Sequence, residues 1–132
     1  MSNYKKNILI TGGAGFIGSH LVIKLVQKYS NYRIINVDSL TYASNLKNLL
    51  DIENSSNYIF EKIDIRDKIS INKILIKYEV DNIIHLAAES HVDNSIENPI
   101  EFAQTNVIGT LNLLESARNY WNNKKTRHRP NS

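Results

Sequence analysis

The sequence predicts a single α/β domain with a doubly wound, mainly parallel sheet. Short runs rich in β-branched residues alternate with amphipathic stretches along all 132 residues. The composition, 42% hydrophobic and 22% charged, is typical of a chain with a packed core. No apolar run approaches the ~20 residues that a membrane span needs. Connections between parallel strands are right-handed, so we expect helices on both faces of the sheet.

Four strands and four helices are expected in alternation. The strands are predicted at residues 7–11, 33–38, 58–63 and 82–87, where Ile and Val dominate. The helices are predicted at 16–29, around 46–50, after an N-cap at Asp67, and from about Pro99 to Trp121. In the long final helix, apolar residues recur at steps of three and four and predict its buried face: Ile100, Ala103, Val107, Leu111, Leu114, Ala117 and Trp121.

The charge distribution divides the chain into a domain, residues 1–123, and a basic tail, residues 124–132. The net charge is +3, but four basic residues lie in the tail, and the domain has 12 basic against 13 acidic residues. A basic face for nucleic acid is therefore not predicted. Cysteine is absent, which excludes disulfides and thiolate metal sites. Together with the lack of a signal peptide, this composition is compatible with a cytoplasmic protein.

The strongest local motif is Thr-Gly-Gly-Ala-Gly-Phe-Ile-Gly, which lies between the first predicted strand and the first predicted helix. In such a motif Gly12 permits a tight turn, Gly15 lets the backbone approach a pyrophosphate, and Gly18 lets the helix pack closely. The helix N-terminus then presents N–H groups to the anion. Asp38 follows Gly18 by 20 residues, at the end of the next strand, where an acid binds a ribose 2′-hydroxyl and repels a 2′-phosphate. The pattern predicts a Rossmann-like fold that binds NAD rather than NADP.

Three further segments narrow this prediction. They are Asp38–Leu46 (D-S-L-T-Y-A-S-N-L), His85–Asp93 (H-L-A-A-E-S-H-V-D) and Thr105–Thr110 (T-N-V-I-G-T). With the Gly motif, they resemble the dTDP-glucose 4,6-dehydratases, in the extended branch of the short-chain dehydrogenase/reductase superfamily. The resemblance covers about residues 7 to 127. It implies the N-terminal half of a Rossmann-like sheet with strand order 3-2-1-4, whose fourth strand forms an apolar edge.

The resemblance also implies where NAD is held. The implied contacts are Gly12, Gly15, Phe16, Ile17 and Gly18 at the pyrophosphate; Asp38, Ser39, Leu40 and Thr41 at the adenosine ribose; Asp64 and Ile65 at the adenine; and Leu86, Ala87, Ala88, Glu89, Ser90 and Thr105 along the rest of the cofactor. Ser90 would also lie near the sugar nucleotide. Asp38, Asp64 and residues 87–90 follow predicted strand ends, where doubly wound sheets bind their ligands, and Thr105 would contact the cofactor from the long helix.

The implied reaction removes water from a dTDP-sugar through a hydride relay with NAD, in deoxysugar synthesis of the rhamnose type. The family's Tyr-x-x-x-Lys pair and its Asp–Glu pair are expected beyond residue 127. This chain has two Tyr-x-x-x-Lys matches, and neither fits the family's pair. The match at Tyr58 lies in a predicted strand. The match at Tyr120 closes the helix before the expected fifth strand. We therefore predict no catalytic residue and no metal site in this chain. Weak or no NAD binding and no turnover are expected from it alone, whereas the complete enzyme would be a homodimer.

Several residues also have structural alternatives. Residues 64–67 could form only a capped turn, and Glu89 and His91 are more simply positional or solvated than a catalytic pair. His85 is predicted to be a satisfied residue of the sheet, and Gly109 to mark a close approach of its helix to the sheet or cofactor. Two alternative functions stay open: a UDP-sugar epimerase or decarboxylase of the same superfamily, and a non-catalytic nucleotide-binding module.

Overall fold

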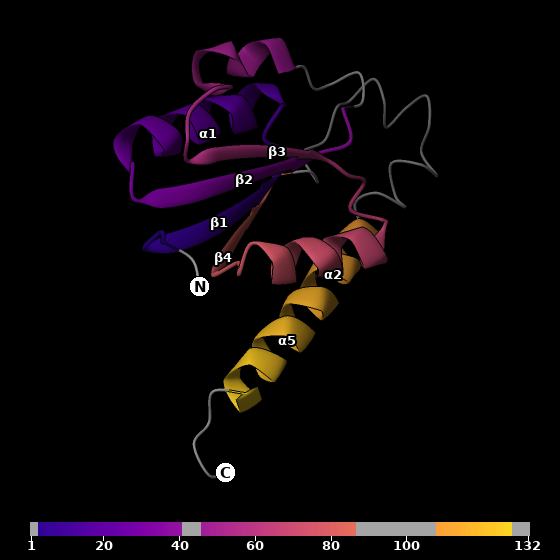
Figure 1. The fold of residues 1–132 in the computed structure, drawn as a ribbon. Helices are drawn as coiled ribbons and strands as arrows, with labels where there is room; N and C mark the ends of the chain where they lie inside the picture. Colours follow the sequence, from indigo (N-terminus) through magenta and orange to yellow (C-terminus); the bar gives the residue numbers. More distant parts are fainter. Residues whose placement is uncertain (1–2, 41–45, 87–107, 128–132) are drawn as a thin grey trace, which may run out of the picture.

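The computed structural model describes residues 3–40, 46–86 and 108–127 (Figure 1). The alternation of strands and helices predicted from the sequence is confirmed in these ranges. The elements are β1 (Lys6–Thr11), α1 (Phe16–Lys28), β2 (Tyr32–Asp38), the 3-10 helix η1 (Leu46–Ile52), β3 (Tyr58–Lys62), α2 (Lys68–Lys77), β4 (Asn82–His85) and α5 (Thr110–Arg127).

The four strands form one parallel sheet in the order β3-β2-β1-β4, which confirms the predicted fold class. In the centre of the sheet, Leu9 of β1 is paired with Ile35 of β2 and with Ile83 of β4. Because all four strands run in the same direction, their carboxyl ends meet at one edge of the sheet. The predicted cofactor segments follow these ends.

Helices cover both faces of the sheet, with α1 and η1 on one side and α2 and α5 on the other (Figure 1). Alternate residues of the central strands point to opposite faces. Ile8, Ile10 and Ile34 pack under α1 and η1, while Leu9 and Ile35 pack under α2 and α5. Residues of β1 and β2 are therefore buried on both faces, which explains their nearly continuous hydrophobic sequence.

The buried face of α5 differs from the predicted one. Leu111 and Leu114 are 57% and 64% exposed, whereas Leu113 and Ser116, which the spacing does not select, are buried. Ala117 is buried, as predicted. Ile100, Ala103 and Val107 lie outside the described residues. The predicted face was chosen by apolar spacing, but the helix is oriented by its packing on α2, which turns Leu113 inward. The helix also continues to Arg127, four residues into the predicted tail, where no Gly or Pro interrupts it.

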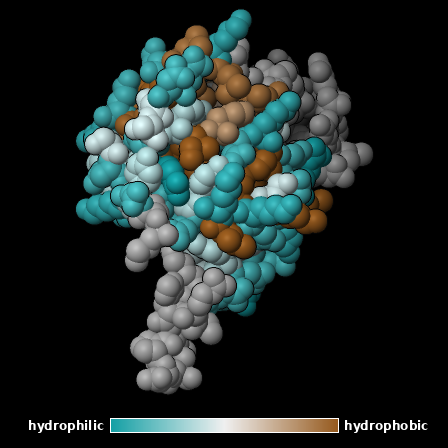
Figure 2. Space-filling model, in the orientation of Figure 1, coloured by the Kyte–Doolittle hydropathy of each residue, from teal (hydrophilic) through white to brown (hydrophobic). Residues whose placement is uncertain are grey.

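Hydrophobic side chains also reach the surface. On the face shown in Figure 2 they emerge among hydrophilic residues.

At the edge of the sheet, β4 is paired with β1 alone among the described strands, as predicted for an apolar edge. None of the helices in the described ranges combines the length and apolar character needed to cross a membrane.

Candidate functional site

The Gly-rich turn has the geometry that its sequence predicts. Gly12 has φ of 77°, a left-handed conformation that glycine adopts without steric cost. Its N–H donates to the carbonyl of Val37 (2.8 Å), so the turn is tied to the end of β2. A Cβ on Gly18 would collide with the carbonyl oxygen of Gly12 and lie 3.0 Å from Gly13 Cα. The absence of side chains at these positions therefore lets α1 start directly against the turn.

The N-terminus of α1 is suited to bind an anion. Its N-cap is Gly15, which provides no side-chain cap, and its first turn contains no acidic residue. The Ser19 N–H donates to the Gly15 carbonyl (2.8 Å), so the N–H groups before it lie ahead of the first helical hydrogen bond. Phe16 and Ile17, at the start of the helix, are 75% and 56% exposed. Backbone N–H groups at a helix start are the arrangement that binds a pyrophosphate in dinucleotide folds.

Asp38 ends β2 and connects the turn to the following loop. Its carboxylate accepts hydrogen bonds from the Ala14 N–H (3.0 Å) and the Leu40 N–H (2.8 Å). The second bond supports Leu40 in a left-handed conformation, with φ of 58°. Leu40 packs its side chain against the core under α1, and Ser39 is half-buried. Asp38 is buried, so the two backbone hydrogen bonds fix the position of its carboxylate between the turn and the loop.

The loop after β3 brings Asp64 to the same edge of the sheet, where the Ile63 N–H donates to the Asp38 carbonyl (3.2 Å). The side chain of Arg66 donates to both oxygens of Asp64, over 2.5–3.1 Å. These hydrogen bonds hold the pKa of the Asp64 carboxyl below its usual range, so it is an ionised acceptor. Ile65 is buried and packs its side chain in the core cluster under α2 and α5.

The capped turn that was the alternative for residues 64–67 is also present. Asp67 accepts hydrogen bonds from the N–H and the hydroxyl of Ser70 (3.2 and 2.7 Å) and caps α2, as predicted. A capped turn and a ligand contact at Asp64 are compatible, because the cap uses a different carboxylate. The role of Asp64 and Ile65 at an adenine stays a prediction.

At the end of β4, His85 is a satisfied residue of the sheet, as predicted. Its Nδ1 lies 2.6 Å from Thr11 Oγ1 and its Nε2 lies 2.9 Å from Thr110 Oγ1, so it connects β1 to the start of α5. Burial lowers its pKa. The Leu86 N–H donates to the Thr11 carbonyl (2.8 Å), which places Leu86 beside the Gly-rich turn.

Some predicted contacts lie outside the described residues. They are Thr41, Ala87, Ala88, Glu89, Ser90 and Thr105. His91, the other member of the rejected catalytic pair, lies outside them too.

Sequence reasoning missed the residues beneath the turn. A Cβ on Gly13 would collide with Asn36 Oδ1 and lie 2.8 Å from Val22 Cγ2, so Gly13 is needed for space. Asn36 is fully buried, and its amide donates to the Tyr58 hydroxyl (3.2 Å). Asn48 of η1 donates to the Ala14 carbonyl (3.4 Å). The only signal in the sequence was the Gly12-Gly13 pair and a polar residue within a strand.

Comparisons with known proteins agree with this geometry. The model of the GDP-mannose 4,6 dehydratase family matches residues 9–130. The dTDP-glucose 4,6-dehydratase of Neisseria gonorrhoeae is 50% identical over 117 residues, which are 89% of this chain and 34% of the relative. The crystal structure of the dTDP-glucose 4,6-dehydratase of Bacillus anthracis in complex with NAD has 43% identity and a TM-score of 0.78, over 87% of this chain and 34% of that one.

A second enzyme class is also similar in structure. The UDP-glucose 4-epimerase of Thermotoga maritima, crystallised with UDP-glucose, has 39% identity and a TM-score of 0.74, over 86% of this chain and 34% of the epimerase. The fold therefore does not separate the two activities. The chain spans about a third of the length of all these relatives.

Proposed function

Because the chain belongs to the GDP-mannose 4,6 dehydratase family, we propose that it forms the NAD-binding part of a dTDP-glucose 4,6-dehydratase. The observation that carries this proposal is the 50% identity to a dTDP-glucose 4,6-dehydratase across 89% of the chain. The geometry supports it, since the predicted pyrophosphate turn, Asp38 and Asp64 gather at one edge of the sheet.

The described residues fit a dinucleotide. The N-terminus of α1 would bind the pyrophosphate, where Gly12 supplies the left-handed turn and Gly18 allows close packing. Asp38 would bind the adenosine ribose, and its charge would repel the 2′-phosphate of NADP. The Asp64 carboxylate and the Ile65 backbone would face the adenine. When bound, NAD supplies a reversible hydride acceptor to the reaction.

The substrate would be a dTDP-sugar that loses water, in deoxysugar synthesis. Ser90 would lie between cofactor and sugar nucleotide. In the family, the Tyr–Lys pair and the Asp–Glu pair that act on the sugar correspond to sequence beyond residue 127. We therefore expect weak or no NAD binding and no turnover from the 132 residues alone. The complete enzyme would be a cytoplasmic homodimer, as the family resemblance implies.

A chimera tests the proposal. It joins residues 1–127 of this chain to the part of the Neisseria gonorrhoeae dehydratase that follows its matched region. Supplied with dTDP-glucose, the chimera should form the 4-keto-6-deoxy sugar, whereas the 132-residue chain should form none. A chimera whose Gly18 is replaced by Ala serves as a control with a disrupted turn.

A second chimera separates the alternatives. It joins residues 1–127 to the part of the Thermotoga maritima epimerase that follows its matched region. Formation of UDP-galactose from UDP-glucose by this chimera, with no product from the dehydratase chimera, would support an epimerase instead. Tight NAD binding by the 132-residue chain itself, with a folded monomer in solution, would support a non-catalytic binding module. Turnover by the 132-residue chain alone, without the added dehydratase part, would contradict the prediction that the catalytic residues correspond to sequence beyond residue 127.

A further inference from the structure

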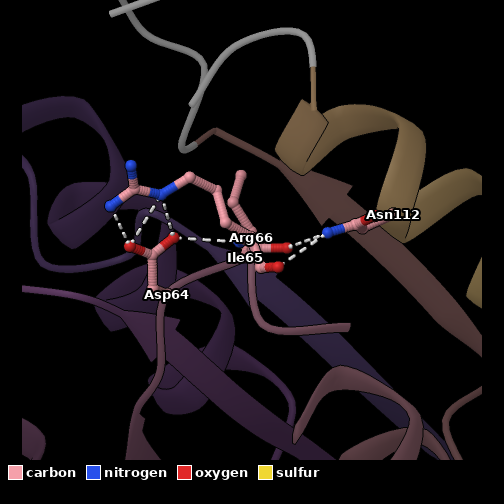
Figure 3. Close-up of polar contacts among 4 residues, drawn as sticks. All are labelled: Asp64, Ile65, Arg66 and Asn112. Carbon is pink, nitrogen blue, oxygen red and sulfur yellow. Dashed lines mark hydrogen bonds and ion pairs between the residues drawn. The ribbon is translucent and has the colours of Figure 1, made fainter. Parts of the chain in front are cut away.

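The loop between β3 and α2 is held from the side by α5. The amide of Asn112 donates to two successive carbonyl groups of this loop, those of Ile65 (3.2 Å) and Arg66 (2.9 Å). Figure 3 shows Asn112 reaching from α5 toward both oxygens. The side-chain NH₂ group thus uses both of its hydrogens on this loop. The two accepting residues lie 47 and 46 positions earlier in the chain.

Two neighbours of Asn112 reinforce this contact. Gly109 leaves room for Ile65, because a Cβ at Gly109 would lie 2.5 Å from Ile65 Cγ1. Glu115 accepts a hydrogen bond from Lys68 of α2 (2.6 Å), on the surface. Asn112 and Glu115 are spaced by three, so they lie along one face of α5, and Gly109 directly precedes the helix. This face of α5 contacts the β3–α2 loop and the start of α2.

The loop in turn orients the carboxylate of Asp64. While the carbonyl groups of Ile65 and Arg66 accept from Asn112, Arg66 donates its backbone N–H to Asp64 Oδ1 (2.9 Å) and its guanidinium to both oxygens of Asp64. In Figure 3 the Asp64 and Arg66 side chains face each other on the side of the loop away from Asn112. Side chains of both residues are 36% exposed, so the carboxylate stays within reach of a ligand.

We propose that Asn112 is a positioning residue for the adenine end of the cofactor site, because it holds the loop that aims Asp64 and the Ile65 backbone. The inference rests on the proposed function. It adds a residue of α5 to the adenine end of a site whose adenine contacts the sequence motifs place only after the third strand. Among the described residues, the side-chain hydrogen bonds of Asn112 go to the two loop carbonyl groups, so it acts through Asp64 and Ile65.

The first experiment measures nucleotide affinity in the chimera. AMP and nicotinamide mononucleotide compete with NAD for the adenine and nicotinamide halves of the site. Asn112→Ala should weaken the affinity for AMP about tenfold, as expected when the free energy of about one hydrogen bond is lost. The affinity for nicotinamide mononucleotide should stay within about twofold of that of the unsubstituted chimera. Asn112→Asp should be worse than Ala, since a carboxylate would face two carbonyl oxygens. Asn112→Gln should restore part of the loss. Asn119→Ala, at an exposed Asn of the same helix, is the matched control.

The second experiment needs no cofactor and uses the 132-residue chain. Amide hydrogen exchange of residues 65–67 should be faster in Asn112→Ala than in wild type or Asn119→Ala, with exchange in β1 unchanged. Equal loss of both half-nucleotides, an AMP affinity equal to that of the control, or unchanged exchange would each overturn the proposal. A chimera without substitutions that binds no NAD would overturn the proposed function as well. This result is distinguishable from a failure of the Asn112 proposal, because it is obtained before any residue is replaced.

Discussion

Replacing Gly18 by Ala tests how closely α1 is packed on the Gly-rich turn. The added Cβ would collide with the Gly12 carbonyl oxygen and lie 3.0 Å from both the Gly12 carbonyl carbon and Gly13 Cα. These atoms belong to the backbone, so no side chain can rotate away. Overpacking of this kind costs up to about 3 kcal/mol, while the better helix propensity of Ala returns at most about 1 kcal/mol. The free energy of unfolding should therefore fall by about 2 kcal/mol.

Urea unfolding of the 132-residue chain without nucleotide measures this change. With an m-value of about 2 kcal/mol/M, the midpoint should fall by about 1 M. The control is Gln27→Ala, at an exposed residue of the same helix, which adds no atom. A midpoint for Gly18→Ala that equals or exceeds that of wild type would refute the close packing, because helix propensity would then be the only effect of the substitution.

Three further predictions concern stability. Gly109→Ala should lower the midpoint of unfolding, and an Ile65→Ala background should remove that loss in a double-mutant cycle, because Ile65 provides the obstructing atoms. Since burial lowers the pKa of His85 from its usual 6.5, stability should be complete above about pH 6.5 and should decline as the pH falls toward the folded-state pKa. In His85→Gln, the melting temperature should fall less as the pH is lowered. A fall equal to that of wild type would show that another group causes the pH dependence. Asp67→Ala should lower the melting temperature by about 3 °C through loss of the α2 cap, and an unchanged value would show that the cap contributes nothing.

Features with local causes could be predicted from the sequence. The Gly-rich turn depends on residues within one strand–turn–helix unit, and the cap at Asp67 depends on Ser70, three residues away. The strand order follows from alternating elements and the resemblance to a known family. For these features, residue type and spacing contain most of the physical information.

Features set by distant partners could not be predicted. Apolar spacing predicts Leu111 and Leu114, among others, on the buried face of α5, but both are exposed. Spacing does not show which side of the helix packs on α2, because tertiary contacts decide it. Asn112 resembles any polar helix residue until the fold brings the Ile65 carbonyl to it from 47 positions away. Gly109 gave a partial signal: its cost within a helix indicated a close approach, but the partner, Ile65, lies in a loop rather than a strand.

We propose that the edge formed by the Gly-rich turn, Asp38 and Asp64 binds NAD. The most direct measurement is the identity of the nucleotide that the chimera retains after incubation with equal amounts of NAD and NADP, released by denaturation and separated by chromatography. Charge repulsion between Asp38 and a 2′-phosphate, about 3 kcal/mol, predicts retention of NAD over NADP by about 100-fold. Equal retention of the two, or retention of neither, would contradict the account.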